Sequence, residues 1–213
     1  MANPLSPRAS TEINVMNAQL ASNATFTAAT SDVITSSAHG MSNGDVITVA
    51  SSTTLPAGLS ASTYYFIISA DTNTFKVSTT PGGSAVDITD TGTGTHTWYR
   101  EREGDNIDVN EFRHIEVSID LENSPDVTIK CVGAITDSLP SFLNPQTVSN
   151  RYDFIQVVDK EDAATIDGDT GIAFAASGNR QVVVNVDGLS FITFKTLNYK
   201  AGDITIKMKG FRN

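Results

Sequence analysis

The sequence predicts an all-β protein, with a small β module followed by a jelly-roll-like β-sandwich and preceded by an extended N-terminal arm. Two observations support this fold class. Short runs rich in β-branched and aromatic residues recur along the chain, separated by Gly, Pro and Asn turn signals. Beyond residue 110, apolar and polar residues alternate with the period of two that strands require. We place the arm at residues 1–23, the small module at 24–100 and the sandwich at 105–213.

Composition narrows the class of partner. The chain has 213 residues, 39% of them hydrophobic and only 18% charged, and its formal net charge is −10. The 14 basic residues are scattered, so we expect no nucleic-acid partner. No apolar stretch approaches the ~20 residues that span a bilayer, and residues 1–20 lack the apolar core of a secretory signal. We therefore expect neither a membrane partner nor export by a signal peptide.

The N-terminal arm shows no sustained strand or helix period. Its apolar residues are isolated: Leu5, Val15, Met16 and Leu20. Such a segment cannot bury enough surface by itself to offset the entropy of ordering it. The segment is then either a flexible end or an arm that lies extended against another polypeptide. We favour the arm, with these four side chains binding the partner.

The small module is punctuated by close turns. Asn43-Gly44 and Pro81-Gly82-Gly83 separate runs such as "GDVITVAS" and "TYYFIISA", and this spacing favours short strands. A burst of charge within "WYREREGDNID" then marks the connection to the second module, which we place near residues 101–105.

The second module alternates more cleanly. One face of each of three strands is apolar and is predicted to form the core. These residues are Ile115, Val117 and Ile119; Val182, Val184 and Val186; and Ile204, Ile206 and Met208.

A long connection interrupts the second module. Residues 137–150 carry Phe142 and Leu143 between two prolines, and long loops with apolar tips are uncommon unless a partner uses them. Phe142 and Leu143 are therefore candidate partner-binding residues. The alternative, in which Phe142 folds back onto its own sandwich, stays open.

The three histidines do not predict catalysis. His114 falls on the polar face of a strand, whereas His39 and His96 lie near the two ends of the small module. A histidine base needs a nucleophile and an orienting carboxylate, and a metal site needs further ligands at suitable spacing. The pattern indicates neither, so His39 and His96 are predicted to hydrogen-bond turn backbone, and the chain is predicted not to be an enzyme.

An acidic run is the other candidate site. Asp159, Asp167 and Asp169 could supply oxygen ligands to calcium. The spacing departs from the EF-hand loop, and Asp-Gly is also a common turn. We assign no metal and no cofactor, with calcium kept as an alternative.

The remaining candidate residues are predicted to have structural roles. Cys131 lies in an apolar run and is predicted to be a buried thiol, since a single cysteine allows no intrachain disulfide. Tyr64, Tyr65 or Trp98 could form a glycan-binding platform, but aromatic residues at strand positions are more often core.

Residues 39–98 resemble a repeat of tailed-phage structural proteins. The landmarks occur in order: "HGMSNGD", "LPAGL", "YY", "NTF" and "GTGTH". The ending from residue 181 is similar, more loosely, to the last strands of sandwiches in phage head-decoration and tail proteins. The resemblance implies that His39 and His96 help to close the module.

The resemblance also implies a function. We expect a virion structural protein, assembled in the host cytoplasm, that binds capsid or tail subunits and forms a homo-oligomer. Capsid decoration is the first interpretation. A tail tube or fibre component, or a glycan-binding module at the tail tip, is the alternative.

Overall fold

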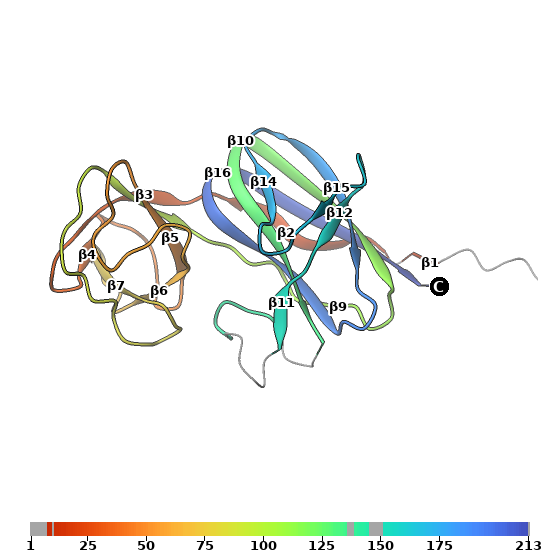
Figure 1. Cartoon of the computed structure of the whole chain (residues 1–213), viewed down its shortest axis with the longest axis horizontal. Coiled ribbons are helices and arrows are strands. Elements are labelled where there is room, and N and C mark those ends of the chain that lie inside the picture. Colours follow the sequence, from red (N-terminus) through yellow and green to blue (C-terminus); the bar gives the residue numbers. More distant parts are fainter. Residues whose placement is uncertain (1–7, 10, 136–138, 145–150, 213) are drawn as a thin grey trace, which may run out of the picture. The chain divides into compact units, whose positions relative to one another are not determined.

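The computed structural model describes residues 8–9, 11–135, 139–144 and 151–212. All its regular elements are strands, so the predicted all-β class is confirmed (Figure 1). The described residues contain no helix that is long and apolar enough to cross a membrane.

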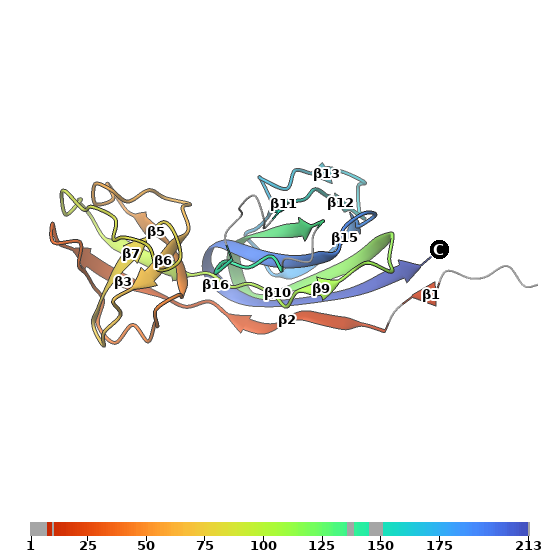
Figure 2. The same cartoon turned by 90° about the horizontal axis from the view of Figure 1, so that it is seen from below.

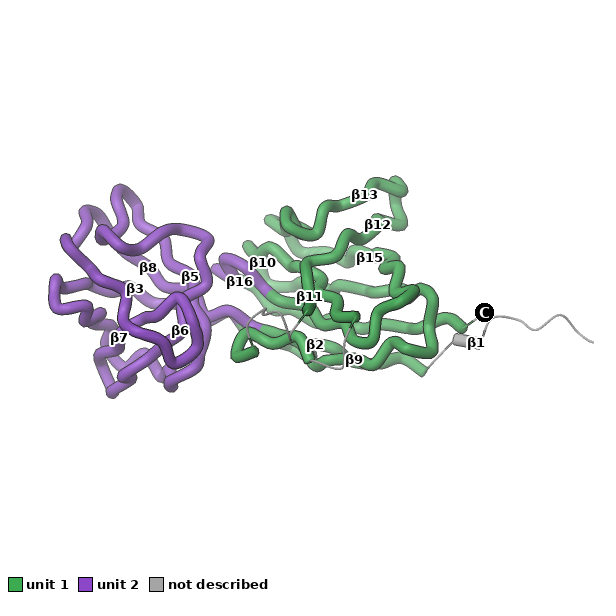
Figure 3. The backbone as a smooth tube through the Cα atoms, turned by 60° about the horizontal axis from the view of Figure 1, so that its bottom comes forward, with its two compact units in different colours: residues 1–20, 103–195, 201–213 green, residues 21–102, 196–200 purple. Residues whose placement is uncertain are grey.

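The chain divides into two compact units (Figure 3). One comprises residues 1–20, 103–195 and 201–213 and is called the sheet unit here. The other comprises residues 21–102 and 196–200 and is called the barrel unit. Residues 21–102 of the barrel unit nearly coincide with residues 24–100, the range predicted for the small module. Residues 196–200, which the sequence analysis placed in the sandwich, belong to the barrel unit instead.

Six short antiparallel strands close the barrel in the order β3-β4-β7-β6-β5-β8. They are β3 (Asn23–Ala28), β4 (Ile34–Thr35), β5 (Val46–Ser51), β6 (Tyr65–Ile68), β7 (Thr74–Ser78) and β8 (His96–Arg100). Closure leaves no unpaired sheet edge to be covered.

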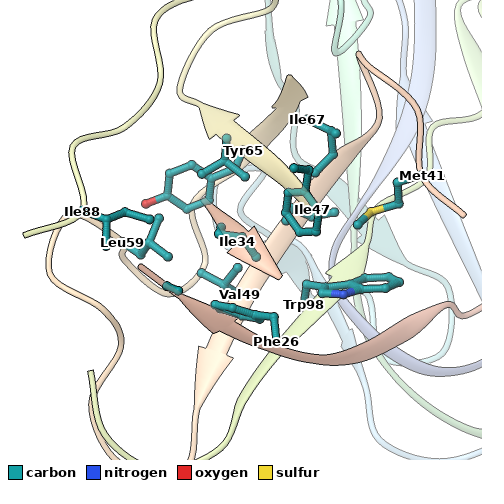
Figure 4. Close-up of a cluster of buried hydrophobic side chains, with 13 residues drawn as sticks. Phe26, Ile34, Met41, Ile47, Val49, Leu59, Tyr65, Ile67, Ile88 and Trp98 are labelled. Carbon is teal, nitrogen blue, oxygen red and sulfur yellow. The ribbon is translucent and has the colours of Figure 1, made fainter. Parts of the chain in front are cut away.

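The barrel interior is filled by large apolar side chains. Trp98, Tyr65 and Phe75 are each at most 2% exposed, and Figure 4 shows Trp98 and Phe26 at one side of the cluster and Tyr65 at the other. Their size matches the interior of a small barrel, which side chains must fill completely.

The sheet unit contains ten hydrogen-bonded strands. Along the main path they run β1-β16-β10-β15-β12-β13, with β2 and β9 added to β16 and with β11 and β14 added to β10. The strands are β1 (Arg8–Ala9), β2 (Ile13–Leu20), β9 (Ile107–Asp108), β10 (His114–Ala134), β11 (Tyr152–Phe154), β12 (Val157–Asp159), β13 (Thr165–Ile166), β14 (Ile172–Phe174), β15 (Gly178–Asn185) and β16 (Phe191–Arg212).

A corner in β10 gives this sheet two layers. The first half of β10 pairs with β15 and the second half with β14 and β11. Between the halves, Asn123 and Ser124 take positive φ angles of 58° and 55°, which turns the strand. Gly202 of β16 lies opposite, where a Cβ would come within 2.6 Å of the Pro125 Cα. Figure 2 shows β12 and β13 in one layer and β2, β9 and β16 in the other, which agrees with the predicted sandwich.

The predicted core faces of the sheet unit are confirmed. All nine residues assigned to them are buried, with exposed fractions of 2% or less. Cys131 is buried as predicted, and burial raises the pKa of its thiol.

The predicted N-terminal arm is wrong for residues 13–20. They form β2, which pairs antiparallel with β16 of the same chain, and Figure 2 shows the two strands side by side. Val15 and Met16 are buried in the sheet unit. Ala18 has a φ of 44° and the register with β16 shifts twice. These irregularities bury two consecutive residues, so the strand lacks the alternation by which strands are recognised.

Candidate interaction surface

Exposed apolar side chains gather on one loop of the sheet unit. Among the described residues, the large hydrophobic side chains that are exposed are Leu20, Ile135, Leu139 and Leu143. Three of the four lie between residues 135 and 143, after the end of β10. We call Leu139–Asn144 the apolar loop. Leu139 and Leu143 are 47% and 57% exposed.

The apolar loop alternates between inward and outward residues. Pro140 and Phe142 are buried, whereas Leu139 and Leu143 face solvent. Phe142 is 7% exposed, and its ring lies under the Lys195 ammonium, with 4.5 Å between Nζ and the ring centroid. The two leucines are therefore exposed while the residues between them anchor the loop.

An ion pair between the exposed Glu103 and the buried Lys195 holds the loop in place. Glu103 Oε1 accepts a hydrogen bond from Ser141 Oγ at 2.8 Å, and its Oε2 accepts one from the backbone N of Phe142 at 2.7 Å. The same Oε2 lies 3.9 Å from Lys195 Nζ. One carboxylate thus binds both the loop and the cation.

Lys195 is enclosed by aromatic rings. Its Nζ lies 4.9 Å from the Tyr152 centroid in addition to its contact with Phe142. Ring faces stabilise a cation electrostatically, but burial still lowers the pKa of Lys195 to about 8, while Glu103 opposes that shift. We call Glu103, Lys195, Phe142 and Tyr152 the clamp.

Hydrogen bonds fix the loop backbone as well. Tyr152 Oη donates to the carbonyl of Ser141 at 3.2 Å, and Asn144 Nδ2 donates to the carbonyl of Leu139 at 3.1 Å. A surface fixed before binding loses little conformational entropy when a partner covers it. The geometry suits a preformed contact for another protein.

The predicted partner-binding residues have different outcomes. Leu143 is exposed on the apolar loop, and Leu20 is exposed at the end of β2. Phe142 faces inward as an anchor, which is the alternative that the sequence left open. Val15 and Met16 are core residues, so their side chains are not available to a partner. Leu5 lies outside the described residues.

Sequence reasoning missed the clamp. Lys195 is a single charged residue inside "SFITFKTLNY", a strand that is otherwise apolar or neutral. A lysine in such a strand needs a partner, and this signal was available. Its partner Glu103 could not be deduced, because the pairing depends on how the segment before β9 meets β16.

The calcium candidates are not brought together. Asp159 forms an ion pair with Arg180, and Asp167 Oδ1 accepts a hydrogen bond from the backbone N of Asp169 at 2.9 Å, which makes a turn. A hydrogen bond from the backbone N of Glu161 and the contact with Arg180 lower the pKa of Asp159. In the described ranges, no group of three or more His, Cys, Asp or Glu could hold a metal ion.

The two histidines of the barrel unit bind turn backbone, as predicted. His39 Nδ1 accepts a hydrogen bond from the backbone N of Met41 at 3.0 Å. His96 Nε2 lies 3.0 Å from the carbonyl of Thr91, and its Nδ1 lies 3.0 Å from Ser51 Oγ. Each ring therefore closes a turn.

The aromatic residues considered for a glycan platform are structural. Tyr65 and Trp98 are core residues, and Trp98 Nε1 donates to Ser36 Oγ at 2.9 Å. Tyr64 Oη donates to the carbonyl of Thr196 at 2.9 Å. None of the three forms an exposed platform.

No protein-family model matches the chain, and no curated protein matches it. Among solved structures, it is similar to the crystal structure of the SPBc2 prophage-derived protein YomS, with a TM-score of 0.39 and 16% sequence identity. The likeness covers 52% of this chain and 81% of that one. Similarity at this level supports no inference about function.

Proposed function

We propose that this chain is a non-enzymatic structural protein of a phage virion that binds neighbouring subunits, with capsid decoration as its role. The apolar loop is the observation that carries the binding function, because it offers exposed leucines on a fixed backbone. The resemblance of residues 39–98 to a repeat of tailed-phage structural proteins supports the proposal that the assembly is a phage virion.

The binding mechanism is burial of Leu139 and Leu143. Covering one leucine completely contributes about 1.5–3 kcal/mol, which is modest for a single contact. In a symmetric particle, however, many copies make the same contact, and linked copies reinforce one another. The net charge of −10 favours a partner surface with basic residues around an apolar depression.

Particle assembly with leucine variants tests this function. We expect Leu139→Ser with Leu143→Ser to reduce the copies retained on purified particles at least about tenfold, since the variant loses most of the apolar burial. The melting temperature of the isolated protein should be unchanged, because both side chains face solvent.

Leu20→Ser is the matched control. Leu20 is equally exposed but lies outside the loop, so this variant should remain on the particle. Loss of Leu20→Ser alone would move the contact to the end of β2, and full retention of the double variant would exclude the apolar loop. Labelled antibodies viewed by electron microscopy would distinguish a capsid position from a tail tube, tail fibre or tail tip.

A further inference from the structure

A groove on the barrel unit is lined mainly by threonine and serine residues. It encloses about 620 Å³ between β3, β4 and the segment that leads into β8, a volume within the range of about 300–1,000 Å³ found for ligand sites. Its lining contains no charged residue. It consists of Thr25, Phe26, Thr27, Ala28, Thr35, Ser36, Ser37, Thr91, Gly92, Thr93, Gly94, Thr95 and His96.

Exposed hydroxyl groups occupy alternate positions on all three walls. In β3 the side chains alternate across the strand, so Thr25 and Thr27 face outward while Phe26 is buried. The seven exposed hydroxyl residues are Thr25 and Thr27, Thr35 and Ser37, and Thr91, Thr93 and Thr95. Within the described structure their side-chain oxygens make no hydrogen bond to the protein, so the donors and acceptors are all available to a ligand.

The wall formed by residues 91–95 is rigid. His96 ties it to Ser51 and to the carbonyl of Thr91, and Thr93 exchanges backbone hydrogen bonds with Thr54. Gly92 has a φ of 66°, and a Cβ there would lie 2.6 Å from the Thr54 carbonyl oxygen. The wall is therefore held close to the barrel by contacts that a larger residue would break.

The floor of the groove is closed. Phe26 and His96 are buried, with their ring centroids 5.3 Å apart. Ser36, also buried, donates its hydroxyl to the carbonyl of Thr25 and accepts the Trp98 indole N–H. A ligand in this groove would meet hydroxyl groups along its sides and a packed surface of buried side chains beneath.

We propose that this groove binds an uncharged carbohydrate chain. Sugar hydroxyls are both donors and acceptors, as threonine and serine hydroxyls are, so each can pair with the other in either direction. Nothing in the lining neutralises a charge, and the net charge of −10 disfavours anionic polymers. An extended peptide is the less suitable occupant, because strand addition needs a free edge and the barrel is closed.

The site is independent of the apolar loop, which belongs to the other unit. Its test uses the full chain and an array of immobilised uncharged glycans, among them dextran, amylose and cellulose oligomers, beside acidic glycans and unstructured peptides. We expect retention on at least one uncharged glycan and weaker or no retention on acidic ones.

Isosteric variants assign the binding to the groove. Thr27→Val with Thr93→Val keeps the β-branched shape that strands favour but removes one hydroxyl from each of two walls, and should weaken retention at least about tenfold. Thr79→Val with Thr89→Val removes two exposed hydroxyls of the same unit outside the groove and should bind like the original chain. Unchanged melting temperatures show that both double variants are folded.

The remaining outcomes overturn the proposal. Failure to bind any uncharged glycan would exclude this ligand class, and equal losses in both double variants would place binding elsewhere. Retention on peptides alone would make the groove a site for an extended chain. None of these results bears on retention of the leucine variants on particles.

Discussion

Glu101 is a buried carboxylate that the barrel unit surrounds with donors. Its Oε1 accepts hydrogen bonds from Thr48 Oγ1 at 2.6 Å and from the backbone N of Tyr199 at 3.3 Å. Its Oε2 accepts one from Thr196 Oγ1 at 2.6 Å. Burial raises the pKa of Glu101, and the donors only partly oppose that shift. The folded protein therefore holds this proton more tightly than the unfolded chain does.

This pKa shift predicts a pH dependence of stability. Stability from the protonated Glu101 is fully present below the unfolded pKa of 4.5 and is lost as pH rises through the higher folded pKa. Glu101→Gln stays neutral, so its free energy of unfolding should fall less over that range. Urea titrations at a series of pH values measure the slope. The exposed Glu122→Gln should keep the original slope, and an identical slope for Glu101→Gln would contradict the assignment.

The lowered pKa of Lys195 predicts that stability rises with pH in the alkaline range. Its pKa is about 8 in the folded state against an ordinary 10.5, so the unfolded chain binds more protons between these values. Stability attributable to this group should therefore rise as pH increases from about 8 to 10.5. Lys195→Met should abolish that rise in urea titrations, whereas the more exposed Lys160→Met should keep it. A rise that survives Lys195→Met must come from another group.

At the scale of the element, β2 shows why part of the fold escaped prediction. The strands of the sheet unit that alternate regularly, such as His114–Leu121, were recognised with the correct core face. In β2 the register shift that skips Val15 lets Val15 and Met16 both be buried, and their burial depends on pairing with β16, which follows much later in the chain. Local alternation contains no information about such a pairing.

The role of β2 in the fold predicts a stability cost. Val15→Ala with Met16→Ala should lower the free energy of unfolding of the sheet unit by several kcal/mol, about 2–5 for a buried Met and less for Val. Thermal melts of the full chain measure the effect. Asn14→Ala with Asn17→Ala, which changes exposed positions of the same strand, should cost much less. Equal melting temperatures for both pairs would restore the interpretation of this segment as a dispensable arm.

At the scale of the whole molecule, the division into two units could be predicted from the sequence only in part. The charged segment near residues 101–105 does mark the passage from the barrel unit to the sheet unit. The return of residues 196–200 to the barrel unit is hidden, because they lie inside β16, a single strand in the structure. Their assignment depends on side-chain partners such as Glu101 and Tyr64, which are distant in sequence.

The barrel unit should therefore be incomplete without Thr196–Lys200. A fragment of residues 21–102 would leave Glu101 without the donors of Thr196 and Tyr199, and Tyr64 Oη without the carbonyl of Thr196. Each buried polar group that loses its partner costs about 1–3 kcal/mol, so the fragment should melt well below the same barrel in the full chain.

Joining residues 196–200 to its C-terminus through a flexible Gly-Ser linker should recover much of the loss. The same linker carrying these five residues in scrambled order should recover none. If the bare fragment is as stable as the linked one, the segment only passes by the barrel and does not complete it.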